Sequence, residues 1–158
     1  MSDNDGLLFE PEWPSEAEPS IEYYSEDIDF DVDNPTKLSS WITSVIEAEK
    51  KELLHLNFIF SSDNYLHQIN LEYLNHDTFT DIITFPYSDP PRIHGDIFIS
   101  IERIRENAHQ FKTSFSNELH RVMIHGVLHL CGYGDKLPEE KSLMTKKENG
   151  ALQMRSIL

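Results

Sequence analysis

The stretch HGVLHLCGYGD, from His125 to Asp135, places two histidines four residues apart and an aspartate six residues after the second one. Residues four apart on an α-helix project from the same face, so His125 and His129 would lie one turn from each other. Their neighbours in the sequence are mostly apolar, and an imidazole in such surroundings is costly unless a partner satisfies it. The pattern therefore predicts a buried helix over residues 117–130 whose two histidines need partners.

The residues after this helix can supply a third ligand. Gly132 is a typical helix stop, because glycine adopts the left-handed conformation at little cost. The next two residues can reverse the chain and bring Asp135 back toward the two rings. Two neutral imidazoles and one carboxylate, with a fourth position open to water, make the pattern of a catalytic zinc site. Two histidines at this spacing are also common in ordinary packing, and the residues by themselves leave that alternative open.

One feature of the helix argues against a peptidase. In the HExxH pattern of zinc proteases, a glutamate follows the first histidine and acts as general base. Gly126 occupies that place here. The helix therefore offers no such base.

Three ordered blocks carry a resemblance to a known family. The stretch at residues 125–135 resembles the HGxLHLxGYDH signature of the YbeY family, whose third histidine falls on Asp135. LEYLNHDTFTDIITFPY at residues 71–87 and GDIFIS at residues 95–100 are similar to two further blocks of that family. The likeness runs from about Ile21 to the C-terminus.

The resemblance implies a single-strand-specific, metal-dependent endoribonuclease. It would act in 16S rRNA 3′-end maturation and ribosome quality control, with His125, His129 and Asp135 binding one Zn²⁺. The implied partners are single-stranded RNA, rRNA and the ribosome or a ribosomal protein, and neither DNA nor a membrane. Two alternatives stay open: a non-catalytic, metal-stabilised ribosome-assembly factor, and a different metal-dependent hydrolase.

Two positions depart from the family pattern. Asp135 supplies an anionic oxygen in place of an imidazole, which makes harder divalent metals such as Mn²⁺ acceptable beside Zn²⁺. Leu74 stands where the resemblance leads us to expect an arginine, a natural clamp for phosphate. Arg121, one turn before His125, is a candidate replacement, although an ion pair with Glu118 is the more ordinary role for it.

Four further side chains are candidates for catalysis or substrate binding. Asp81 is a candidate proton acceptor or a candidate partner that holds a metal-binding histidine in place, and equally an ordinary residue at the start of a strand. Thr80 and Thr84 come from the block that the resemblance places at the cleft. Lys136 follows the metal motif and can bring phosphate close, although a solvated surface lysine is the more ordinary interpretation.

Length and charge limit the class of protein. A chain of 158 residues is one ordinary domain. Residues 1–36 carry 12 of the 28 acidic side chains and none of the 13 basic ones. Residues 1–20 are predicted to be an acidic, disordered tail, and residues 21–158 the endoribonuclease domain. From Lys37 onward the chain has 16 acidic and 13 basic residues, a net charge of −3. The lack of a basic excess implies weak non-specific affinity for RNA, so specificity would require a pocket, a metal or a docking partner.

Cysteine use and hydropathy indicate the compartment. Cys131 is the only cysteine, which excludes an internal disulfide and fits a reducing cytoplasm. No run of 18 apolar residues exists, so no membrane span is expected. We therefore expect a cytoplasmic protein.

Alternating short elements predict a single small α/β (α+β) domain. Its mixed sheet of about four strands would be packed by about five helices, with the metal site on a central buried helix. Strands are expected over residues 28–32, 54–60, 81–85 and 96–101, and helices over residues 35–51, 62–73, 101–111, 117–130 and from 138 onward. The strand order cannot be derived from the pattern.

Overall fold

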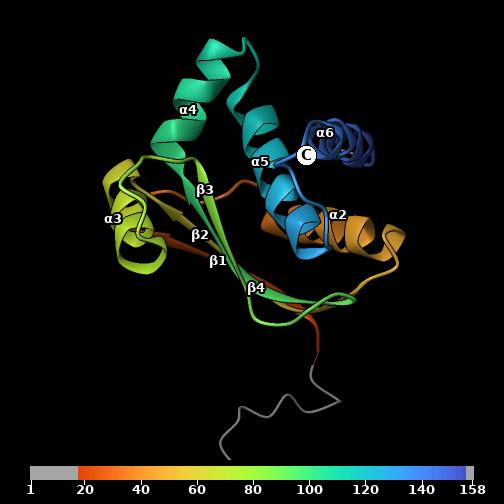
Figure 1. The fold of residues 1–158 in the computed structure, drawn as a ribbon. Helices are drawn as coiled ribbons and strands as arrows, with labels where there is room; N and C mark the ends of the chain where they lie inside the picture. Colours follow the sequence, from red (N-terminus) through yellow and green to blue (C-terminus); the bar gives the residue numbers. More distant parts are fainter. Residues whose placement is uncertain (1–17, 156–158) are drawn as a thin grey trace, which may run out of the picture.

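A computed structural model of the chain describes residues 18–155. These residues form a four-stranded sheet in the order β1-β2-β4-β3 and five helices (Figure 1). The elements are β1 Ser20–Glu26, α2 Pro35–Ala48, β2 Glu52–Ser61, α3 Asp63–Leu74, β3 Ile82–Pro86, β4 Arg92–Ser100, α4 Ile101–Gln110, α5 Phe115–Leu130 and α6 Pro138–Gln153. β1, β2 and β4 are parallel, and β3 runs antiparallel to β4. The predicted small α/β domain with a mixed sheet is therefore confirmed.

The main core lies between the sheet and the helices α2 and α5. Strand residues alternate between the two faces of a sheet, so every second residue of β2 and β4 points into this core. The side chains concerned are fully or almost fully buried and include Leu56, Phe58, Phe60, Ile97 and Ile99. Helix α3 lies on the opposite face of the sheet (Figure 1).

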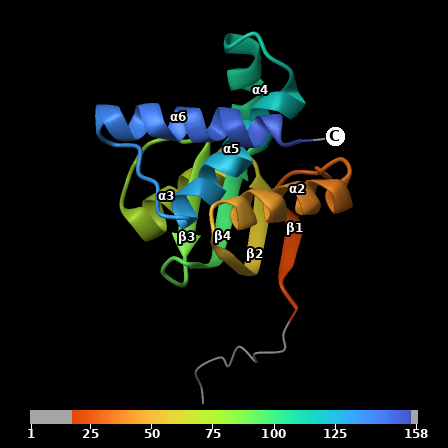
Figure 2. The ribbon, with the colours of Figure 1, turned by 90° about the vertical axis from the view of Figure 1, so that its right-hand side faces the viewer.

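Helix α5 is the central helix of the domain. It packs against β3 and β4 on one side, and α6 crosses it on the side away from the sheet (Figure 2). Its N-terminus is capped by the hydroxyl of Ser114, which accepts a hydrogen bond from the Asn117 backbone at 3.0 Å. Ten of its 16 residues are buried, which is the expected state of a helix that is apolar on nearly all sides.

The first strand lies earlier in the chain than the alternation at residues 28–32 predicts. The strand is Ser20–Glu26, and residues 28–32 have no regular structure. Asp27 has a φ of 61°, which turns the chain out of the sheet. Ile28, Phe30 and Val32 nevertheless pack against the core. Their alternation therefore reflects burial outside the sheet, and the predicted strand there is wrong.

Strand β4 begins four residues before the predicted start at Asp96. Arg92 pairs with Glu52 and Ile93 with Leu53, so the strand extends almost to Pro91. The loop between β3 and β4 is correspondingly short. Proline lacks the backbone N–H that hydrogen bonding between strands requires. β4 accordingly begins at Arg92, directly after Pro90 and Pro91.

Two further expectations concern the acidic N-terminal tail and the lack of a membrane span. Most of the predicted acidic tail, residues 1–17, lies outside the described residues, and Ser20 already belongs to β1. Within residues 18–155, no helix is long and apolar enough to cross a membrane.

Gly126 allows α5 to approach the sheet closely. A Cβ atom at this position would lie 3.0 Å from Cδ1 of Ile82 and 3.0 Å from Cδ1 and Cγ2 of Ile97. Gly126→Leu is therefore expected to lower the free energy of unfolding by about 1–3 kcal/mol, measured by urea denaturation.

A matched control lies on α6. A Cβ at Gly150 would meet no atom within 4 Å, so Gly150→Leu is expected to keep or slightly raise the stability. Equal losses at the two positions would contradict a packing origin for the effect at Gly126.

Candidate metal centre

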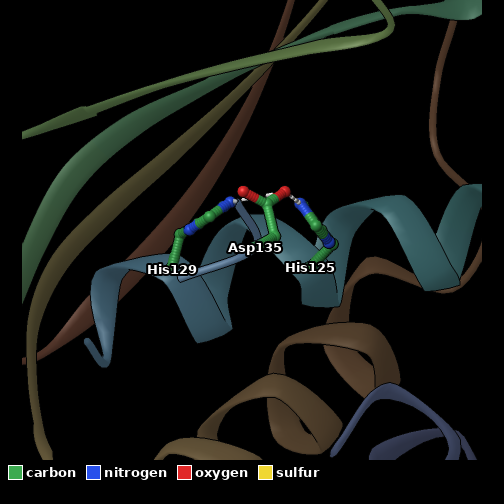
Figure 3. A group of neighbouring side chains, drawn as sticks. All are labelled: His125, His129 and Asp135. Atoms are coloured by element: carbon green, nitrogen blue, oxygen red, sulfur yellow. Dashed lines mark ion pairs between the residues drawn. The ribbon is translucent and has the colours of Figure 1, made fainter. Parts of the chain in front are cut away.

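Two histidines of α5 and one aspartate of the following turn converge at a single point. Nε2 of His125 lies 3.3 Å and Nε2 of His129 lies 3.4 Å from Oδ2 of Asp135. Figure 3 shows the carboxylate between the two rings, with both rings directed toward it. All three side chains are partly exposed, so an ion can reach them from solvent.

The turn that returns Asp135 to the helix is firmly held. Gly132 has a φ of 114°, which reverses the chain where α5 ends. The Tyr133 hydroxyl donates to Oε1 of Glu49 at 2.6 Å, and Oε1 of Glu140 accepts from the backbone N–H groups of residues 136 and 137, each at 3.0 Å. The position of Asp135 therefore depends on both α2 and α6.

The second nitrogen of each ring has its own partner. Nδ1 of His125 lies 2.7 Å from Oε2 of Glu148 on α6, and Nδ1 of His129 lies 2.8 Å from the carbonyl oxygen of Tyr133. When these partners accept a hydrogen bond from Nδ1–H, each neutral ring keeps its proton on Nδ1, and its unprotonated Nε2, directed at Asp135, is free to bind a metal. A histidine held in this way by a carboxylate or carbonyl is characteristic of metal sites.

Glu148 is a site residue that sequence reasoning did not identify. It is only 8% exposed, and its Oε1 also accepts from Nη1 of Arg121 at 2.9 Å. Burial by itself lowers the pKa of His125. The hydrogen bond and charge of Glu148, together with the charge of Asp135, outweigh burial and raise that pKa above its ordinary value.

Two of the three distances between ligand atoms match a tetrahedral metal ion, and all three ligand atoms lie within 4.8 Å of one another. Ligand atoms about 2.0–2.2 Å from a tetrahedral ion are separated from one another by about 3.3–3.6 Å. The two nitrogen–oxygen distances of 3.3 and 3.4 Å fall in that range. His125, His129 and Asp135 can therefore hold a metal, as the sequence predicted.

A pocket of about 790 Å³ opens beside these three side chains. The predicted substrate residues Thr80, Thr84 and Lys136 line it, and so do Asp81 and Leu74. The residues that the resemblance assigned to a cleft are therefore brought to the same pocket as the metal-binding group.

The two candidate catalytic residues have different surroundings. The carboxylate of Asp81 accepts from Nδ2 of Asn107 at 3.3 Å, and burial raises its pKa above the ordinary value. Glu148 and the Tyr133 carbonyl, not Asp81, are bonded to the histidine rings. Of the roles considered for Asp81, that of proton acceptor remains a prediction.

Arg121 does not make the ion pair that the sequence suggested. It pairs with Glu148 and also donates to the side chain of Asn149 at 2.8 Å, whereas the expected partner was Glu118. It is not among the residues that line the pocket. These contacts direct Arg121 toward α6 and make it a weak candidate for contact with phosphate.

Comparison with known proteins finds relatives that are similar over most of the chain. The family model described as endoribonuclease YbeY matches residues 20–155. A protein of Flavobacterium psychrophilum named endoribonuclease YbeY is 53% identical over 131 residues, which are 83% of this chain and 94% of that protein. A protein of the same name from Amoebophilus asiaticus is 52% identical over 131 residues, covering 82% and 89% of the two chains.

A solved structure shares the fold. The solution structure of TM1509 from Thermotoga maritima matches with a TM-score of 0.63 and 25% sequence identity, covering 85% of this chain and 88% of that one. The matched family region contains every element from β1 to α6, including the helix and turn that carry His125, His129 and Asp135. The chain therefore belongs to the YbeY family.

Proposed function

We propose that this chain is a zinc-dependent endoribonuclease that cleaves single-stranded RNA in 16S rRNA 3′-end maturation and ribosome quality control. The observation that carries the proposal is the convergence of His125, His129 and Asp135 beside a pocket in a chain of this family. The relatives with about 50% identity are named endoribonuclease YbeY.

His125, His129 and Asp135 would hold the ion, and Glu148 would orient His125. A Zn²⁺ ion in such a site supplies Lewis acidity toward a phosphoryl oxygen and lowers the pKa of water. Manganese is an acceptable second ion because one of the three ligands is a carboxylate.

The other pocket residues would position the substrate and move protons. Asp81 would accept a proton, because it lines the same pocket as His125 and His129 and burial raises the pKa of its carboxyl above the ordinary value. Lys136 would contact a phosphate, and the hydroxyl groups of Thr80 and Thr84 would bind polar groups of the RNA.

The proposed partners are rRNA and the ribosome or a ribosomal protein, in the cytoplasm. Cys131 is buried, and burial raises the pKa of its thiol to about 12, so it is an unreactive packing residue.

The two alternatives, a non-catalytic assembly factor and a different metal-dependent hydrolase, make different predictions for activity.

The experiment is a cleavage assay with the full chain purified without chelators. Stoichiometric zinc and metal-dependent cleavage of single-stranded RNA, with the same sequence in a duplex left intact, are expected. Activity on a casein-type substrate without cleavage of RNA would favour the different hydrolase. Bound metal without turnover of either substrate would favour the assembly factor.

A further inference from the structure

The pocket extends from the candidate metal centre around the open edge of β3. β3 is the last strand in the order β1-β2-β4-β3, and successive residues on both of its faces line the pocket, among them Ile82, Ile83 and Thr84. The C-terminal half of α3 also lines the pocket, through Asn70 and Leu74. The part of the pocket lined by β3 and α3 is not required to hold the ion, so it is available for another role.

The charge of this pocket is unfavourable for a phosphate backbone. Among residues 18–155, Lys136 is the only lysine or arginine that lines it, whereas Asp81, Asp89 and Asp135 contribute three carboxylates. Proteins that bind RNA through its phosphates usually present a basic face. Leu74, which is 41% exposed, is apolar where the resemblance leads us to expect an arginine.

The pocket instead offers neutral hydrogen-bonding groups. The Tyr87 N–H donates to the His94 carbonyl at 2.8 Å and the Ser100 N–H donates to the Asp81 carbonyl at 3.0 Å, so residues 81 and 87 are bonded to β4. In an antiparallel pair these bonds alternate every second residue, which directs the backbone groups of Thr84 toward the open edge. Neutral donors and acceptors of this kind match the edge of a nucleobase.

The backbone that carries two side chains of the pocket, Leu74 and His76, is held by hydrogen bonds. Leu74 and His76 flank Asn75, which has a φ of 57° and ends α3. The His76 backbone N–H donates to the Asn70 carbonyl at 3.1 Å, and Nδ2 of the buried Asn70 donates to the Thr78 carbonyl at 2.9 Å. An apolar side chain and an imidazole ring are suitable partners for the face of a base.

We propose that this pocket binds one unpaired nucleobase of the RNA, with Leu74 and His76 against its face and Thr84 at its edge. The inference rests on the proposed function, because the base would belong to a nucleotide next to the phosphate at the metal centre. The pocket volume of about 790 Å³ exceeds what one base fills, so the attached sugar and phosphate can lie in the same pocket. Such a pocket would account for the proposed preference for single strands, since a base in a duplex is not available to enter it.

The test is a scan with abasic nucleotides. The full chain is titrated against a short, labelled 2′-O-methyl single strand, either intact or with one abasic residue placed at each position in turn, and binding is followed by fluorescence anisotropy. One or two adjacent positions are expected to weaken binding about tenfold when abasic, and the others are expected to have little effect. A flat scan would overturn the proposal.

Two variants test whether Leu74 and His76 contact the base at the sensitive position. Leu74→Ala and His76→Ala are each expected to weaken binding of the intact strand about fivefold relative to the unaltered chain. Neither is expected to weaken binding of the strand that is abasic at the sensitive position. Tyr73→Ala is the matched control, because Tyr73 precedes Leu74, is 67% exposed and does not line the pocket. Equal losses for the intact and abasic strands in the Leu74 and His76 variants would contradict a base contact.

The outcomes separate this proposal from the proposed function. A peaked abasic scan in a chain that cleaves no RNA would support the base slot and refute the enzyme. A flat scan in a chain that cleaves single-stranded RNA would refute the slot and support the enzyme.

Discussion

His129→Ala is expected to remove stoichiometric metal and to lower the rate of RNA cleavage by about a thousandfold or more. His129 supplies one of the three donors that converge in the part of the chain that the structure describes, and the remaining imidazole and carboxylate do not complete a site. Metal catalysis contributes several kcal/mol of transition-state stabilisation, and each 1.36 kcal/mol corresponds to a tenfold change in rate. Elemental analysis and single-turnover cleavage of a labelled single strand measure the two losses.

The fold should survive this change, because the His129 side chain is 30% exposed and lies at the end of α5. His109→Ala on α4 is the control, since His109 is exposed and is not one of the three converging residues. Full metal content in the His129 variant would contradict the assignment of the ligand. A lower melting temperature, with RNA turnover at background in both wild type and variant, would indicate an assembly factor whose ion only stabilises the turn.

The local part of the site could be predicted from the sequence. Helical spacing places His125 and His129 on one face, and a glycine two residues after the end of α5 allows Asp135 to return. These relations involve residues within about one turn of helix and one reversal of the chain. They make the convergence of the three side chains possible, and the contacts of Glu49 and Glu140 with the turn then fix the position of Asp135.

Features that depend on distant packing could not be predicted. Glu148 lies 23 residues after His125 and reaches it only because α6 crosses α5, so no local pattern distinguishes it from a surface glutamate. The strand predicted at residues 28–32 has a real alternation of burial. Only the left-handed turn at Asp27 decides that these residues cover the core without joining the sheet.

Glu148→Gln is expected to weaken metal affinity about 10- to 100-fold and to destabilise the fold. Its two carboxylate oxygens accept from two donors, Nδ1 of His125 and Nη1 of Arg121. Glutamine offers one oxygen and one NH₂ group, so one donor must face another donor whichever way the amide turns. Competition with a metallochromic chelator measures the affinity, and urea denaturation measures the stability.

A second substitution tests this cause directly. In the double variant Arg121→Met/Glu148→Gln the competing donor is absent, so the amide oxygen can turn to His125, and part of the lost metal affinity should return. Glu139→Gln, an exposed change of the same type on the same helix, should leave affinity and stability unchanged. If the double variant binds metal no better than Glu148→Gln alone, the negative charge of Glu148, and not its hydrogen bond to Nδ1, would be what sustains His125 as a ligand.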